Sequence, residues 1–208
     1  MQKEAMKNFE KELPENYKLV KAIDAKEARI GILINMIALV VLLVCMVTAY
    51  FIIGVPLKEM LTVEEGANPF INLFKVLIWG ILLILYIILH ELVHGVVYKI
   101  TTKQKLTFGF TLSVAYCGVP KIYVYRKTAL LAVLAPFVVF LPIFLAVCFI
   151  LKNPLEQMLA VALLGMHIGG CSGDLWVTGI LLFQLRDKRT LMNDTGPKQT
   201  FYVPNEEN

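Results

Sequence analysis

Apolar positions gather in four long runs along this chain, and charged residues fill the segments between them. The runs cover residues 30–54, 70–98, 128–151 and 155–185. Each run is long enough for a helix to cross a hydrocarbon core, which takes about 20 apolar residues. The first run is too long for the core of a cleavable signal peptide, and no small-residue cleavage pattern follows it. The pattern predicts an all-α membrane protein with about four transmembrane helices.

The segment between the second and third runs has a different period. Apolar and small polar residues alternate over residues 106–113, and a period of two is typical of a strand. Residues 117–120 supply turn chemistry, and residues 121–126 are again rich in β-prone side chains. We therefore expect a small β-hairpin at about 105–126. It would either connect two helices or offer an edge strand to an extended peptide.

Charge predicts the orientation of the spans. Lysine and arginine are frequent before the first run, between the second and third, and after the fourth, but sparse in the two other loops. The positive-inside rule then places both termini and the central loop in the cytoplasm of a multi-pass protein of the cell membrane. We expect a cytoplasmic arm at 1–29, one membrane-embedded domain at 30–190 and a cytoplasmic tail at 191–208.

Composition agrees with a chain whose main partner is the lipid bilayer. Hydrophobic residues make up 58% of the sequence and charged residues only 17%, which is unlike a soluble domain. The net charge of +4 follows from the loops. It gives no reason to expect nucleic acid, because there is no concentrated basic patch with interleaved aromatic residues.

The second run ends with ionisable residues in the order His90-Glu91-Leu92-Val93-His94. Such residues are costly inside a bilayer and are usually functional there. Histidines at positions i and i+4 share one face of a helix, so both imidazoles can reach one metal ion. Glu91 lies beside them as a candidate general base. We interpret this motif as part of a zinc site in a membrane helix.

The third zinc ligand is expected in the fourth run, since catalytic zinc sites usually have three protein ligands and keep a position open. Asp174 is favoured because an unpaired aspartate in a bilayer is costly and a divalent cation is a sufficient partner. It could instead pair with Lys75 or cap a half-helix, and Cys171 is an alternative ligand. His167 could contact the scissile carbonyl, support a ligand or simply pack between helices. Three glycines should loosen or break the helix here: Gly169, Gly170 and Gly173.

Four stretches carry a family resemblance: residues 13–19 (LPENYKL), 90–95 (HELVHG), 116–120 (YCGVP) and 170–175 (GCSGDL). On these the chain resembles the putative zincin peptidase family of small bacterial membrane proteins, related to the site-2 proteases, which are intramembrane metalloproteases. The resemblance implies that His90, His94 and Asp174 hold zinc and that a β element presents substrate. Site-2 proteases have an L-D-G element after an asparagine-and-proline motif. Here the order is Gly173-Asp174-Leu175, and His167 stands roughly where that asparagine would be.

The expected function is zinc-dependent hydrolysis of peptide bonds in transmembrane or membrane-associated proteins and peptides. Glu91 and His167 are the expected catalytic residues. A non-catalytic membrane metalloprotein acting as scaffold or regulator is the alternative. A transporter is a third hypothesis, which four helices without an evident repeat disfavour. Glu91 separates enzyme from scaffold, because a structural zinc site gains nothing from a carboxylate beside an open coordination position.

Overall fold

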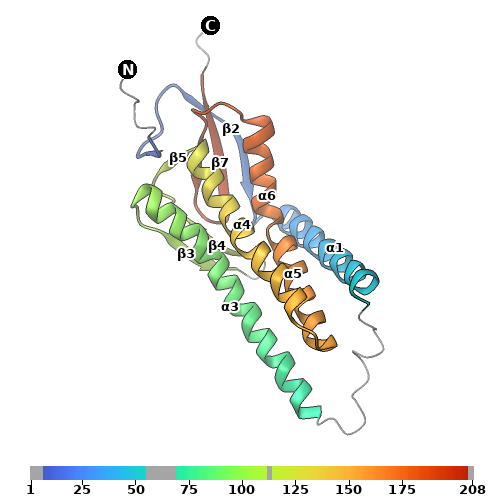
Figure 1. Ribbon diagram of the computed structural model, residues 1–208. Coiled ribbons are helices and arrows are strands. Elements are labelled where there is room, and N and C mark those ends of the chain that lie inside the picture. Colours follow the sequence, from blue (N-terminus) through green and yellow to red (C-terminus); the bar gives the residue numbers. More distant parts are fainter. Residues whose placement is uncertain (1–6, 55–68, 112–113, 206–208) are drawn as a thin grey trace, which may run out of the picture. The chain divides into compact units, whose positions relative to one another are not determined.

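The computed structural model describes residues 7–54, 69–111 and 114–205 (Figure 1). The ends of the predicted arm and tail, and residues 112–113 of the predicted hairpin, lie outside this part. The chain divides into two compact units. The sheet unit comprises Met1–Leu33, His90–Ala135 and Gly173–Asn208, and the helical unit comprises Ile34–Leu89 and Pro136–Ser172. Each unit is described by itself.

Most of the described residues are helical. The helices are α1 (Ala28–Ile53), α3 (Pro69–Thr102), α4 (Arg126–Ile150), α5 (Pro154–Gly170) and α6 (Ser172–Gly179), which a π-helical segment, Ile180–Gln184, extends. Within the described residues, four stretches are long and apolar enough to cross a membrane: Ala28–Ile52, Leu73–Thr102, Arg126–Ile150 and Pro154–Gln184. The chain is therefore a predominantly helical membrane protein, as its hydropathy predicts.

The fourth span is interrupted in the middle. α5 begins at Pro154, where the Asn153 side chain caps the first turn by accepting a hydrogen bond from the Glu156 backbone N–H at 3.2 Å. It ends at Gly170, and Cys171 separates it from α6. The glycine-rich sequence predicts a weakened helix at this point. The break lets α6 start a new helix with Asp174 in its first turn.

Small residues bring two helices of the helical unit close together. A methyl group added at Gly169 on α5 would lie 2.7 Å from both the Cα and the carbonyl oxygen of Ala38 on α1. One added at Gly165 would lie 2.9 Å from the Leu42 side chain. Close backbone approach at small residues is a main source of helix association in membranes, where lipid provides no hydrophobic driving force. Aromatic and aliphatic residues, including Tyr86, Phe144 and Leu164, fill the rest of this core.

Gly169→Ala should destabilise the contact between α1 and α5. The new methyl group would meet backbone atoms of Ala38, which cannot move aside as a flexible side chain can. Overpacking of this kind costs about 1–3 kcal/mol. Gly170→Ala is the matched control, because a methyl group there meets nothing within 4 Å. Thermal unfolding in detergent should show a lower midpoint for Gly169→Ala and no loss for Gly170→Ala. Equal midpoints for the two variants would contradict the close approach of α1 and α5.

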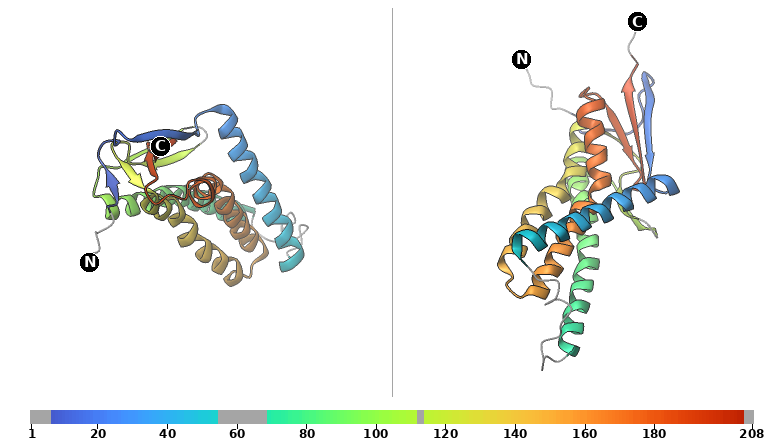
Figure 2. Two further views of the ribbon diagram at one scale, coloured as in Figure 1. Left: turned by 90° about the horizontal axis from the view of Figure 1, so that it is seen from above. Right: turned by 90° about the vertical axis from the view of Figure 1, so that its right-hand side faces the viewer.

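Within the described residues, the sheet unit contains a five-stranded antiparallel sheet in the order β1-β5-β6-β7-β2. Its strands are β1 (Phe9–Glu10), β2 (Tyr17–Asp24), β5 (Tyr123–Tyr125), β6 (Leu191–Asp194) and β7 (Lys198–Pro204). Figure 2 shows the N-terminal β2 (blue) beside the C-terminal β7 (red). Phe9, Val124, Met192 and Phe201 are cross-strand neighbours, and these join one apolar core with residues of α4 and α6.

The sheet changes the picture of the two chain ends. Residues expected as a cytoplasmic arm and tail form β1, β2, β6 and β7. The sequence hides β2 because lysines break its alternation and a bulge shifts the register between Leu19 and Lys21. The partner strand also lies far away in the sequence. Pairing between β2 and β7 therefore depends on tertiary structure.

The strands between α3 and α4 also differ from the predicted hairpin at 105–126. β3 (Thr107–Phe110) pairs antiparallel with β4 (Ala115–Gly118), with Phe108 opposite Cys117. The predicted second strand becomes β5 and pairs with β1 and β6 in the other sheet. Residues 117–120 do not turn the chain back on β3, because the Val119 backbone N–H donates to the Asp194 carbonyl at 2.8 Å. Residues 119–125 thus pair with the C-terminal strands and not with β3.

Candidate metal centre

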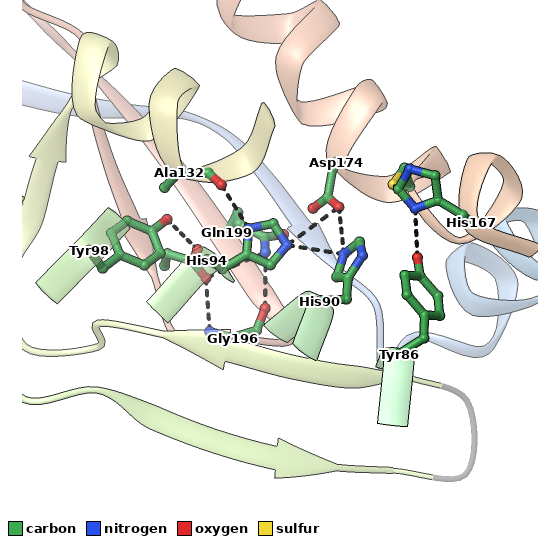
Figure 3. Close-up of polar contacts among 11 residues, drawn as sticks. Tyr86, His90, His94, Tyr98, Ala132, His167, Asp174, Gly196 and Gln199 are labelled. Carbon is green, nitrogen blue, oxygen red and sulfur yellow. Dashed lines mark hydrogen bonds and ion pairs between the residues drawn. The ribbon is translucent and has the colours of Figure 1, made fainter. Parts of the chain in front are cut away.

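His90 and His94 lie on the same face of α3, one turn apart, and both are 7% exposed. Their Nε2 atoms are 3.3 Å apart. Figure 3 shows the two rings with their Nε2 edges turned toward the Asp174 carboxylate. All three residues belong to the sheet unit. The i, i+4 spacing of the motif therefore produces a convergent pair of imidazoles.

Asp174 completes a triangle of potential ligand atoms. Its Oδ2 lies 3.2 Å from His90 Nε2 and 3.5 Å from His94 Nε2. Zinc binds such nitrogen and oxygen ligands at about 2.0–2.2 Å in tetrahedral geometry. Tetrahedral geometry at those bond lengths separates neighbouring ligand atoms by about 3.3–3.6 Å. The three atoms are therefore within about 0.1 Å of the spacing that a zinc ion requires.

A backbone carbonyl fixes the orientation of one imidazole. His94 Nδ1 lies 2.8 Å from the carbonyl oxygen of Ala132, a residue of α4 with no exposed surface. Nδ1–H donates in this hydrogen bond, which leaves the lone pair of Nε2 for a metal ion. Metal-binding histidines almost always carry such an outer hydrogen bond, which sets the tautomer and raises ligand basicity. No side-chain pattern in the sequence could have shown this contact.

Glu91 lies next to the triangle on α3. Its carboxylate oxygen and a ring nitrogen of each histidine lie within 4.8 Å of one another, so this group can hold a metal ion. Glu91 is half-buried, whereas both histidines are buried. A carboxylate at this position can take a proton from a water molecule near the ligand atoms. The structure thus brings together four of the five residues that the sequence singles out.

His167 belongs to the helical unit, and the structure describes it there. It is completely buried, and its Nδ1 lies 2.8 Å from the Tyr86 hydroxyl and 3.7 Å from the Cys171 sulfur. Phe137 stacks on the imidazole, and Phe144 meets it edge-on. Lys75, the alternative partner proposed for Asp174, instead forms an ion pair with Glu156 at 2.8 Å.

Two buried residues near the metal-binding turn were not found from the sequence. Asp194, at the end of β6, accepts a hydrogen bond of 2.6 Å from the Tyr98 hydroxyl. Burial raises the pKa of Asp194 to about 6, although the Tyr98 O–H and the Gly196 N–H, which donate to the carboxylate, oppose that rise. Tyr98 follows His94 by four residues and so shares its helix face. This four-residue spacing was the one sequence signal that could have pointed to Tyr98.

Cys117 on β4 packs against the same region as a neutral thiol. Burial raises the pKa of Cys117 to about 12, and the negative charges of Glu91 and Asp194 add to the rise. Cys117 is 5% exposed, and its sulfur lies 3.3 Å from the position of a methyl group at Gly95 on α3. The thiol thus packs against the turn that carries His94.

The fold and the site together define a membrane protein in which two buried histidines lie beside a partly exposed aspartate carboxylate. The model of the DUF3267 family, described as "Putative zincin peptidase", matches residues 83–188, about half of the chain, and the chain belongs to this family. The match includes every residue that the sequence singles out. Membership supports a zinc-dependent metallopeptidase. No curated protein and no solved structure matches the chain.

Proposed function

We propose that this protein is an intramembrane zinc metalloprotease, of the site-2 protease type, that hydrolyses peptide bonds of transmembrane or membrane-associated substrates. The observation that carries the proposal is the ligand triangle. His90 Nε2, His94 Nε2 and Asp174 Oδ2 are 3.2–3.5 Å apart, and a carboxylate from Glu91 lies beside them. This combination fits a catalytic site better than a structural one, which would use its fourth position for a protein ligand.

The roles of the residues follow from their atoms. His90, His94 and Asp174 would hold the zinc ion, which supplies Lewis acidity that lowers the pKa of water to around 7 and polarises a carbonyl. Glu91 takes a proton from the attacking water as the new C–O bond forms. It then delivers this proton to the leaving nitrogen as the C–N bond breaks. His94 keeps its orientation through the Ala132 carbonyl.

The position of the site on the helices supports a substrate that comes from the membrane. His90 and His94 lie within the span Leu73–Thr102, and Asp174 lies within Pro154–Gln184. Leu92 and Val96, on other faces of the same turns of α3, are exposed apolar residues suited to lipid. The distribution of lysine and arginine further supports a cell-membrane protein with both termini in the cytoplasm. Cleavage would then occur near the cytoplasmic edge.

The β3–β4 pair is the proposed place for the substrate backbone. A methyl group at Gly95 would lie 2.8 Å from the Phe108 ring, so β3 packs directly beside the His94 turn. In the part of the chain that the structure describes, β3 pairs with β4 alone. An extended peptide can add to such an edge through main-chain hydrogen bonds. The substrate must be unwound locally, because a helical backbone hides its carbonyls.

A catalytic role for His167 is a separate part of this proposal. An imidazole could donate a hydrogen bond to the scissile carbonyl or its oxyanion. The Tyr86 hydroxyl at Nδ1 and the aromatic rings around His167 also suit a helix-packing role. Replacing His167 tests this role separately from the metal ligands.

Removal and return of the metal tests the proposal. The protein, purified in detergent, should contain about one zinc ion per chain, as a single three-ligand site requires. After reconstitution, it should cleave a fluorescence-quenched transmembrane peptide that carries an internal Gly-Pro pair. A chelator should remove the zinc and stop cleavage, and added zinc should restore both. Zinc without any cleavage would favour the non-catalytic metalloprotein, and absence of zinc after zinc supply would refute both functions.

A further inference from the structure

The turn between β6 and β7 is built around a buried carboxylate. Asp194 is 4% exposed although it lies near the C-terminal end of the described chain. Its Oδ1 accepts a hydrogen bond from the Gly196 backbone N–H at 2.9 Å. Gly196 has a φ of +100°, which favours glycine at this turn position. Oδ2 is therefore left to face the helix α3.

Asp194 contacts α3 through the side chain of Tyr98. Its hydroxyl donates to Asp194 Oδ2 at 2.6 Å, and the side chain is 1% exposed. Tyr98 and His94 are four residues apart, so they are stacked on one face of α3. Figure 3 shows Tyr98 and His94 on the same helix, and the dashed line at the Tyr98 hydroxyl marks this hydrogen bond. The hydrogen bond to Asp194 thus holds the helical turn next to the one that carries the ligands.

The same turn also contacts the backbone of β4. The Val119 backbone N–H donates to the Asp194 carbonyl at 2.8 Å. A methyl group at Gly118 would collide with the Gly196 nitrogen and would lie 2.8 Å from the Asp194 carbonyl oxygen. β4 in turn packs on α3, since Cys117 sulfur lies 3.3 Å from the position of a methyl group at Gly95. Residues 194–196 therefore join α3 and β4.

We propose that Asp194 is a positioning residue for the metal centre, holding the turn of α3 next to the ligands through Tyr98 and the end of β4 through its own carbonyl. The inference rests on the proposed function, because the turn it positions adjoins the residues assigned to zinc. The C-terminal strands are then a part of the site. A buried carboxylate–hydroxyl pair has this effect because breaking it leaves a polar group without a partner, which costs more than an exposed hydrogen bond.

Zinc affinity in matched tyrosine variants tests the inference. Tyr98→Phe removes only the hydroxyl that meets Asp194. Tyr125→Phe is the control, because the Tyr125 hydroxyl donates at the same 2.6 Å in the same unit, but to Glu10 on β1. Loss of outer-shell support typically weakens metal binding by about 10–100-fold. Competition with a chelator should show zinc binding weakened to this extent in Tyr98→Phe. The zinc affinity of Tyr125→Phe should equal that of wild type.

Two substitutions of Asp194 distinguish positioning from general stability. Asp194→Ala should match Tyr98→Phe in zinc affinity. Asp194→Asn should bind zinc nearly as well as wild type, because its carbonyl can accept from Gly196 and its amide can donate to the Tyr98 oxygen. Equal zinc affinity for wild type, Tyr98→Phe and Asp194→Ala would overturn the inference, and so would equal weakening in Tyr125→Phe.

Amide hydrogen exchange keeps this test separate from the proposed function. If the wild type binds no zinc, the proposed function fails, but the contact can still be measured in the metal-free protein. Tyr98→Phe should then speed exchange at residues 90–102 of α3, whereas Tyr125→Phe should leave it unchanged. Unchanged exchange in Tyr98→Phe would show that Asp194 does not hold this turn.

Discussion

Glu91→Gln is expected to retain zinc at the wild-type level and to lose peptide hydrolysis by a factor of roughly 10²–10⁴, the usual contribution of a general base. Glutamine has nearly the same shape as glutamate but cannot take a proton from water. The ligand triangle of His90, His94 and Asp174 does not include Glu91, so zinc binding should persist. Cleavage rate and zinc content measured on one preparation check both halves of the prediction.

The control for this variant is a second glutamate of the sheet unit. Glu10→Gln alters a carboxylate that pairs with Lys7 and accepts a hydrogen bond from Tyr125. Its cleavage rate should stay close to that of wild type. Cleavage by purified Glu91→Gln at the wild-type rate would exclude Glu91 as the base. Loss of zinc together with cleavage would instead assign Glu91 a role in metal binding.

The helical part of the fold was predictable because long apolar runs have few alternatives. The first predicted span, 30–54, differs from Ala28–Ile52 by two residues at each end, and the ends of the other three agree within four residues. Lipid can satisfy no backbone group, so a long apolar run must form a helix that bonds within itself. Hydropathy alone therefore locates these elements.

The strands were harder to predict because their partners come from distant parts of the chain. Alternation over 106–113 located β3, but its partner is β4, which includes the first two residues of the turn predicted at 117–120. Gly118 reads as a turn residue in the sequence. In the structure its lack of a side chain instead admits the backbone of residues 194–196. A local pattern could not show a contact between segments about 76 residues apart.

The sequence predicted the part of the candidate site that consists of ionisable side chains in apolar runs. It could not predict the part that backbone groups contribute. His90, His94 and Asp174 stand out because ionisable residues are rare in apolar runs. The Ala132 carbonyl supports His94 without any side-chain signature. Asp194 lies in a polar segment, where an aspartate is ordinary, and only the fold buries it against Tyr98. Sequence thus indicates the ligands but misses the residues that orient them.

Asp174→Ala should remove most of the bound zinc and abolish hydrolysis. It deletes the one oxygen of the triangle and leaves two histidines, which rarely hold catalytic zinc alone. The weakening of zinc binding should exceed the roughly 100-fold that loss of outer-shell support can cause. Zinc content after dialysis against a weak chelator measures this effect. Asp187→Ala is the control, since Asp187 forms an exposed pair with Arg189 and should not affect zinc.

Retention of zinc by Asp174→Ala would contradict the assignment of the third ligand and move it to His167 or Cys171. Asp174→Ala combined with His167→Ala, and separately with Cys171→Ala, would then show which side chain holds the ion. Loss of zinc from Asp174→Ala would instead support Asp174 as the third ligand. With Asp174 as ligand, zinc and Glu91 act within the sheet unit, where α6 presents the carboxylate from its first turn. α5 ends at Gly170 and α6 begins at Ser172, so the helix break is what puts Asp174 in a first turn.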